Sequence, residues 1–288
     1  MADFFTSLGQ HTFLQMAVLA ALLSSVACGV VGTFVVARRI TYLAGGIAHA
    51  TLGGMGLARY LHSVHGWELL TPLHGAVSAA LAAALVIGFV TLRAREREDT
   101  VIGAIWAIGM AVGLVFIAMT PGYSQELMSY LFGNILMVTV SDIWLILALD
   151  VVVIALVVAF HNQFNAVCFD AEFARVRGIN VEFYYLLLLV LAALTVVVLV
   201  TVVGIVLVIA LLTLPVAASG MLSRSIWRIM ALSIATCLLV TESGIAASYI
   251  LDLPAGATII LVAALFYAIA LVISRIIRPS GKGRLFLR

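Results

Sequence analysis

The sequence predicts an all-α protein, a polytopic bundle of transmembrane helices, from its composition and from the length and pattern of its apolar runs. Of its 288 residues, 65% are hydrophobic and 10% are charged, whereas a soluble domain has about 45–50% apolar and about 25% charged residues. Apolar runs such as residues 186–203 lack the alternation that a membrane β-barrel requires. A soluble enzyme and a nucleic-acid-binding protein are therefore excluded, and a net charge of +2 is too small to indicate a polyanionic partner.

A helix that crosses the hydrocarbon core of a bilayer needs about 20 mainly apolar residues. Windows of that size give nine candidate spans, and the weak division near Gly204 leaves a range of eight to ten. The nine candidates are residues 12–36, 40–61, 71–92, 100–120, 143–162, 183–203, 204–220, 228–249 and 255–274. We expect them to form a single transmembrane domain over residues 1–288.

The basic residues predict how the chain is oriented in the membrane. With nine crossings, all of the 15 Lys and Arg residues except Arg59 fall on one side. Cytoplasmic loops carry the excess of positive charge in membrane proteins, so we expect the N-terminus outside and the C-terminus in the cytoplasm. The clean separation also supports nine crossings, because a wrong count in the middle of the chain would mix the two sides.

Three ionisable residues lie well inside the candidate spans: His49, Asp150 and Glu242. An ionisable side chain within a bilayer costs at least about 2.5–3.5 kcal/mol, so each is a candidate functional residue. His49 lies about 15 Å along a helix from Arg39, near the middle of the membrane. Gly45 and other small residues one turn away leave a groove that an ion or another helix can occupy. The alternative is a small-residue packing seam with His49 hydrogen-bonded across it; contact with a metal or substrate is the favoured interpretation.

The two carboxylates are weaker candidates than the histidine. Asp150 and Glu242 each lie about seven residues from the outer edge of their spans, where a carboxylate could join an imidazole in a site for zinc, manganese or iron(II). The alternative is a buried carboxylate that caps a helix or pairs with a cation such as Arg59. On their own features, that structural role is favoured for both.

No ATP-hydrolysing site is expected on this chain. The pair Gly281-Lys282 lacks the preceding glycine of a phosphate-binding loop, and neither a zinc-protease nor a Gly-x-Ser-x-Gly pattern is present. We therefore expect a protein that is not an enzyme and binds no cofactor of its own. If transport is active, ATP is hydrolysed by another chain.

Four stretches of the sequence carry distinctive motifs. They are RRITYLAGGIAHATLGG (38–54), ELMSYLFGNIL (126–136), FDAEFARVRGINV (169–181) followed by VVGIVLVIALLTLPVAA (202–218), and YILDLPAGATIILVAALF (249–266). These stretches resemble motifs of the ABC-3 family of permeases, the membrane subunits of ABC importers for manganese, zinc and iron(II). They occur in the family's order over nearly the whole chain, which makes the combination far more specific than any single motif.

The resemblance implies a set of partners and a place in the cell. Two copies of the permease would form a homodimeric pore in the lipid of a bacterial or archaeal plasma (inner) membrane, and no nucleic acid would be involved. Two copies of a cytoplasmic ABC ATPase subunit would dock from inside, and an extracytoplasmic binding protein would deliver the metal. The ATPase would contact a cytoplasmic coupling segment at about 163–182. Its pattern residues are Glu172, Ala174 and Gly178, with Arg175 and Arg177 adding positive charge.

The resemblance also implies a role for His49 and reveals one departure from the family. His49 matches the second-helix histidine implicated in the metal path, but Gly45 stands where the family usually has aspartate. The loss of that carboxylate removes a hard oxygen ligand, so Glu242, Asp150 or a symmetry-related His49 would have to compensate, or the cargo differs. We expect transport of a divalent transition metal, zinc or manganese ahead of iron, with the three residues as transient ligands. The alternatives are a permease for a metal chelate or small organic cargo, and a proton-coupled secondary transporter.

Overall fold

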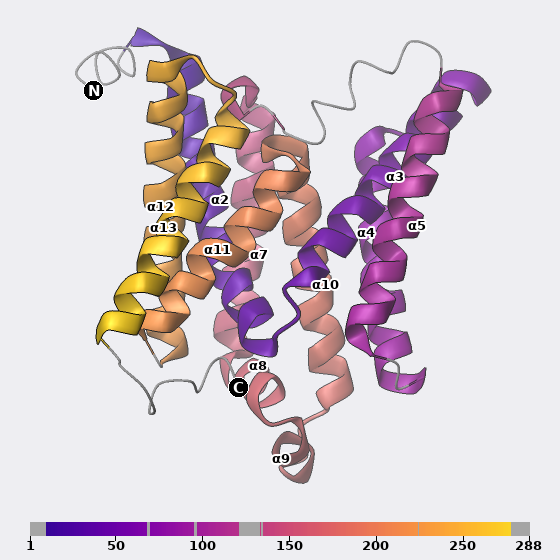
Figure 1. Cartoon of the computed structure of the whole chain (residues 1–288). Coiled ribbons are helices and arrows are strands. Elements are labelled where there is room, and N and C mark those ends of the chain that lie inside the picture. The colour runs from indigo at the N-terminus through magenta and orange to yellow at the C-terminus, as the bar shows by residue number, and fades with distance from the viewer. Residues whose placement is uncertain are drawn as a thin grey trace.

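The computed structural model describes residues 10–67, 70–94, 97–120, 133, 135–223 and 225–277. In this part of the chain the regular secondary structure is all helical (Figure 1). Most of the second quoted motif, residues 126–132 and 134, lies outside the described residues. The α-helices are α2 (Thr12–Arg38), α3 (Tyr42–His65), α4 (Pro72–Phe89), α5 (Glu98–Met119), α7 (Val140–Ala159), α8 (His161–Phe169), α9 (Ala171–Val176), α10 (Val181–Val203), α11 (Ile205–Leu222), α12 (Ile226–Leu251) and α13 (Ala255–Ile277).

The predicted helical membrane bundle is confirmed. In the described residues, eight helices are long and apolar enough to cross a membrane. The one other long helix is α3, whose 24 residues match the predicted span 40–61 but include many glycines and three histidines. The described part of the chain therefore contains nine long helices, and α3 differs from the rest in being only weakly apolar.

The uncertain division between the sixth and seventh predicted spans lies at a single residue. Gly204 has φ +88° and separates α10 from α11, which runs back toward the end from which α10 came (Figure 1). A residue with a side chain rarely adopts this backbone conformation, whereas glycine adopts it readily. One glycine thus takes the place of a longer loop. Because no polar loop separates the two helices, their apolar sequences form one continuous run.

Capping residues fix the start of α7 and of α4. The Thr139 amide donates to Asp142 Oδ2 at 2.9 Å, while the Thr139 hydroxyl accepts from the Asp142 amide, a reciprocal capping box. Thr71 caps α4, whose first residue is Pro72, and proline is favoured at that position because its φ is already helical. Both helices therefore begin where short polar side chains satisfy free backbone amides.

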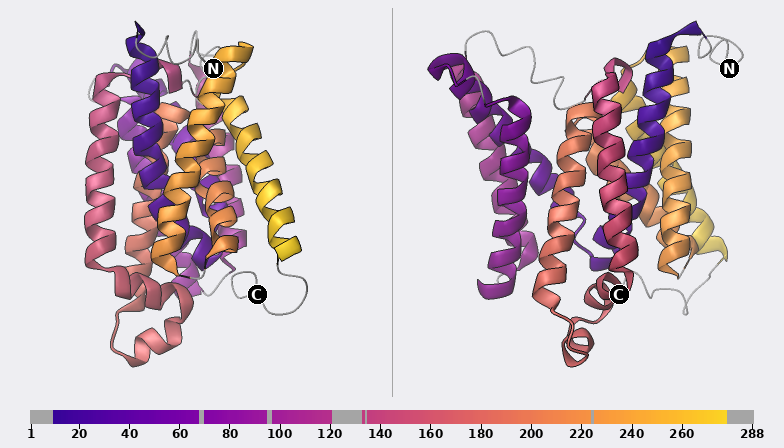
Figure 2. Two further views of the ribbon diagram at one scale, coloured as in Figure 1. Left: turned by 90° about the vertical axis from the view of Figure 1, so that its left-hand side faces the viewer. Right: turned by 180° about the vertical axis from the view of Figure 1, so that it is seen from behind.

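Two packing groups make up the bundle. Helices α2 and α10 are buried along most of their length and form its centre, while α7, α11 and α12 pack against α2, and α13 packs outside α11 and α12. Helices α3, α4 and α5 form a second group that stands to one side and meets the centre mainly where α4 and α3 contact α10 (Figures 1 and 2).

The short helices α8 and α9 project from one end of the bundle (Figures 1 and 2). At this end α2 and α13 finish and α5, α10 and α12 begin. The described basic residues at these helix termini therefore share one end, whereas Arg59 lies in the half of α3 toward the other end. The residues that share the end with α9 are Arg38, Arg39, Arg93, Arg97, Arg175, Arg177, Arg228 and Arg275.

Candidate functional site

Helices α3 and α5 pack closely on each other, and glycines allow their backbones to come into contact. A methyl group added at Gly53 would lie 2.8 Å from the Gly109 carbonyl oxygen, and one added at Gly109 would lie 2.8 Å from the His49 carbonyl oxygen. Such small-residue contacts bring the backbones of membrane helices together. The predicted packing seam is therefore present, and His49 lies within it.

His49 is buried in this seam and stacks on an aromatic ring from α5. Its side chain is 7% exposed, and its ring lies 4.8 Å from the Trp106 ring, centroid to centroid, at an interplanar angle of 19°. The buried Nδ1 has no hydrogen-bond partner in the part of the chain described. At Nδ1, therefore, the described residues provide no hydrogen bond of the kind that the alternative interpretation, a histidine hydrogen-bonded across the seam, requires.

Asp150 lies at the middle of α7, the helix that packs along α2. Its side chain is 3% exposed, and neither carboxylate oxygen has a hydrogen-bond partner among the described residues. A buried polar group normally has such a partner. Asp150 is therefore an unsatisfied group inside the apolar bundle, and the structure gives it no capping or ion-pairing role within the described residues.

Glu242 is partly buried in α12, where its Oε1 atom is buried and has no hydrogen-bond partner in the described residues. Helix α12 packs against α2, α11 and α13, whereas α3 packs against α4, α5, α10 and α11. The three predicted pathway residues thus lie on helices that do not pack closely on one another. Within the described ranges, no group of three or more His, Cys, Asp or Glu side chains could hold a metal ion.

The predicted coupling segment forms two short helices outside the bundle. The Asp170 carboxylate accepts a hydrogen bond from the Phe173 amide at 2.8 Å and so fixes the start of α9. Helix α9 ends just before Gly178, which has φ +78°, as its position in the sequence predicted. Glu172, Arg175 and Arg177 are exposed, whereas Ala174 is fully buried and anchors the helix.

The exposed face of α9 also carries apolar side chains that the sequence analysis did not single out. Phe173 is 54% exposed and Val176 is 87% exposed, both beyond the ends of the membrane-spanning helices. The guanidinium of Arg177 lies 5.4 Å from the centroid of the Phe173 ring, within the range of a cation–π contact. Apolar and basic groups are therefore presented together on a helix that projects from the molecule.

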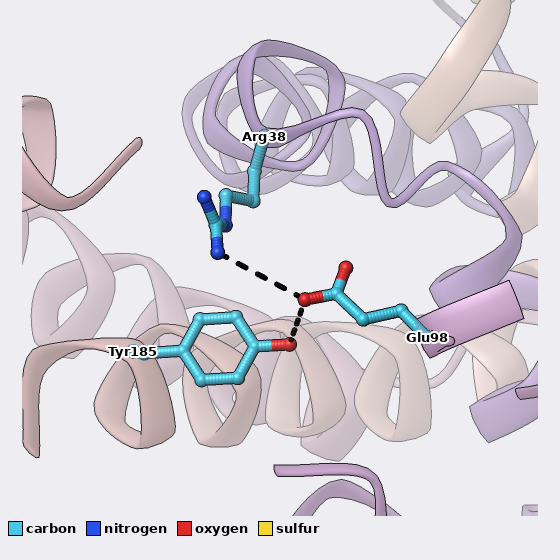
Figure 3. Close-up of polar contacts among 3 residues, drawn as sticks. All are labelled: Arg38, Glu98 and Tyr185. Carbon is cyan, nitrogen blue, oxygen red and sulfur yellow. Dashed lines mark hydrogen bonds and ion pairs between the residues drawn. The ribbon is translucent and has the colours of Figure 1, made fainter. Parts of the chain in front are cut away.

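A polar cluster at the same end joins the two packing groups, and it was missed at the sequence level. The hydroxyl of Tyr185 in α10 donates to Glu98 Oε1 at 2.9 Å, and Arg38 Nη2, at the end of α2, lies 3.9 Å from the same oxygen (Figure 3). Glu98 is the first residue of α5. The cluster therefore ties the α3–α5 group to both central helices.

The cluster lies beside the coupling segment as well. Burial raises the pKa of the Cys168 thiol in α8 to about 12, with the nearby Arg38 charge acting in the opposite direction. Arg38 is thus close enough to α8 to act on its side chains. No local spacing relates residues 38, 98 and 185, so a sequence pattern could not have found the cluster.

We expect Glu98→Ala to destabilise the protein by about 1–3 kcal/mol, because it leaves the buried Tyr185 hydroxyl without an acceptor. Glu98→Gln keeps an oxygen for Tyr185 and removes only the partly exposed pairing with Arg38, which contributes about 1 kcal/mol or less. Thermal unfolding of the purified protein in detergent would measure the difference. Equal losses in the two variants would show that the hydrogen bond is not the stabilising contact.

A family comparison decides the class of the protein. The model of the ABC 3 transport family matches residues 10–274. The chain belongs to this family. Members of the ABC 3 family are transport proteins, and with its apolar helices this chain is a multi-pass membrane permease.

Relatives in the ABC 3 family cover almost the whole chain. It is 42% identical over 263 residues, 91% of this chain and 89% of the relative, to a protein of Chlamydia pneumoniae named as a probable metal transport system membrane protein. It is 32% identical over 267 residues to the manganese transport system membrane protein MntC of Listeria monocytogenes, covering 93% and 92% of the two chains. The solved structure of PsaBC from Streptococcus pneumoniae in complex with Fab matches with a TM-score of 0.82 and 29% identity, over 99% of this chain and 98% of that one.

Proposed function

We propose that the chain is the membrane-spanning subunit of an ATP-driven importer for a divalent transition metal, zinc or manganese ahead of iron. Relatives named for metal and manganese transport support the cargo class. The observation that carries the mechanism is α9, a projecting helix with exposed Phe173, Val176 and basic residues and a buried Ala174. Such a surface fits the groove of a separate ATPase subunit, because exposed apolar side chains beside basic groups are suited to a protein interface.

The exposed surface of α9 would be the point at which ATP hydrolysis acts on the membrane helices. We propose that α9 docks through Glu172, Arg175 and Arg177 on a cytoplasmic ATPase that hydrolyses ATP, so this chain is not itself an enzyme. Movement of α9 and α8 would displace Arg38, at the end of α2, and the adjoining helix α10. These two would then move the α3–α5 group, to which the Arg38–Glu98–Tyr185 cluster ties them. This places the end that carries α9 in the cytoplasm, in agreement with its excess of basic residues.

The proposed ion path includes His49 as a transient ligand. An imidazole nitrogen inside an apolar bundle, with no hydrogen-bond partner in the described part of the chain, is available to a passing ion. A site that satisfied the ion fully would hold it rather than release it. Asp150 and Glu242 are proposed as further transient ligands, because both have carboxylate oxygens without a hydrogen-bond partner among the described residues. The assembly would contain two permease copies, two ATPases and an extracytoplasmic binding protein in the plasma (inner) membrane.

His49→Ala is expected to lower ATP-dependent metal uptake at least about tenfold, since removal of one ligand of a sparse site raises the barrier by about 1.4 kcal/mol or more. Elemental analysis would compare cells that lack this chain with cells that carry the variant, both with the ATPase partner intact and grown in metal-depleted medium. A selective fall of one metal in both strains supports the importer and identifies the cargo. A fall in the deletion strain alone would make His49 a packing residue.

Two alternatives make different predictions in transport assays. The substitution of a carboxylate by Gly45 favours a bulkier or less charged cargo such as a metal chelate, which would compete for uptake where free ions do not. A proton-coupled transporter would use Asp150, Glu242 and His49 as a relay. In that case, proteoliposomes with this chain alone would accumulate the cargo under a pH gradient, without ATP.

A further inference from the structure

The side chain of Trp106 makes two separate contacts with α3 in the seam between α3 and α5. One face of its indole stacks on His49, centroid to centroid 4.8 Å apart. The outer edge of the same ring fills the space beside Gly45, where an added methyl group would overlap Cζ3 and lie 2.9 Å from Cη2. A single residue of α5 therefore determines the surroundings of both His49 and the position one turn before it.

The stack is the contact that orients the imidazole. Nδ1 of His49 has no hydrogen-bond partner in the described residues, so no hydrogen bond at that atom fixes the ring plane. The α3 residues one turn earlier are Gly45 and Gly46, which have no side chains to support the ring. An interplanar angle of 19° leaves the flat face of Trp106 as its support.

The same indole excludes a second ligand from α3. Positions 45 and 49 are separated by one helical turn and share a face, the spacing at which a carboxylate and an imidazole can bind one ion together. The Trp106 ring already fills this space, and its stacking on His49 opposes rotation out of the way. Helix α3 therefore offers the cargo an imidazole without an accompanying carboxylate.

We propose that Trp106 is a positioning and specificity-determining residue of the transport path. It holds His49 as a lone nitrogen ligand and keeps an oxygen ligand out of position 45. Imidazole suits zinc and iron(II), whereas carboxylate oxygens suit manganese, so this arrangement favours nitrogen-preferring ions over manganese. The inference rests on the proposed function, in which His49 contacts the ion.

The test is a double-mutant cycle on Gly45→Asp and Trp106→Ala, in the full transporter reconstituted with its ATPase and binding protein. The measurement is initial ATP-dependent uptake of zinc and of manganese, each over a range of concentrations. Gly45→Asp alone should lower the initial rate of zinc uptake at least about tenfold, because the carboxylate has no room beside the indole. Trp106→Ala alone should raise the KM for zinc about fivefold or more, with less effect on the maximal rate.

The double variant carries the decisive result. Removal of the indole makes room for the carboxylate, so the Gly45→Asp/Trp106→Ala protein should recover transport relative to Gly45→Asp. Its ratio of manganese to zinc uptake should exceed that of the starting protein about fivefold or more. Gly103→Ala on α5 and Trp144→Ala on α7 are matched controls, because Gly103 faces open space and Trp144 is 66% exposed.

Each outcome decides between the inference and the proposed function. If the unaltered transporter accumulates neither zinc nor manganese, nor iron(II) supplied in the same assay, the proposed function fails. If it transports metal, but Trp106→Ala keeps the same KM and metal ratio, or the folded double variant remains as inactive as Gly45→Asp, the role of Trp106 is refuted. Trp106→Leu, which keeps apolar volume but has no ring to stack, replaces Trp106→Ala if that variant does not fold, and an unchanged metal ratio in it would refute the inference equally.

Discussion

Replacement of both Phe173 and Val176 by aspartate is expected to abolish ATP-driven transport while the amount of folded permease stays unchanged. The two side chains are 54% and 87% exposed on α9, and exposed substitutions usually change stability by about 0.5 kcal/mol or less. At an interface, each buried anchor contributes about 2 kcal/mol or more. Loss of both should weaken ATPase binding by at least about a hundredfold, which co-purification with the ATPase subunit would measure.

The matched control for this variant is Met137→Asp. Met137 is also apolar and 78% exposed, but it belongs to a short 3₁₀ turn before α7, at the end of the bundle opposite α9. The Met137 variant should retain the ATPase as the unaltered protein does. Retention of the ATPase by the double aspartate variant would remove α9 from the coupling interface.

Gly54→Val is expected to prevent α3 and α4 from packing and to abolish the folded protein. A methyl group added at Gly54 would overlap the Gly75 carbonyl oxygen, and one added at Gly75 would overlap the Gly54 carbonyl oxygen. Because both obstacles are backbone atoms, no side-chain rotation relieves them. Overpacking by side chains alone costs about 1–3 kcal/mol, so a backbone clash in both directions should cost more.

Size-exclusion chromatography in detergent would measure the yield of monodisperse protein. Gly75→Val should fail in the same way, whereas Gly103→Ala, with no atom near the added methyl group, should give a normal yield. A monodisperse Gly54→Val protein with normal transport would show that α3 and α4 are further apart in the working permease.

The helices could be predicted because a membrane span is recognised from the composition of about 20 consecutive residues. All nine predicted spans correspond to long helices, and even α3, the least apolar of these nine, was found as a window of about 20 mainly apolar residues. The contacts that join the helices could not be predicted. Trp106 meets His49 only because α5 returns alongside α3, and Tyr185 meets Glu98 across 87 positions of sequence.

In the candidate site too, neighbours on the same helix could be predicted from the sequence, whereas contacts with other helices could not. The surroundings of His49 on its own helix, including Gly45, could be seen in the sequence as a groove. What fills that groove is an indole from another helix, which no spacing rule within α3 reveals. The depth of Asp150 and Glu242 in the membrane was predictable. That both carboxylate oxygens of Asp150 and the Oε1 atom of Glu242 are buried without a hydrogen-bond partner among the described residues became apparent only in the packed bundle.

The weak apolar character of α3 has a consequence for how the protein is made. A nascent segment enters the bilayer from the translocation channel when its own transfer free energy is favourable, and α3 has glycines, histidines and Arg59 where its neighbours have aliphatic residues. Its residence in the membrane depends on α4 and α5, which cover it on both sides. Helix α3 should therefore stay at the translocation channel until α4 and α5 have been synthesised, and enter the lipid together with them. If the ribosome stalls before residue 119, α3 should remain outside the bilayer.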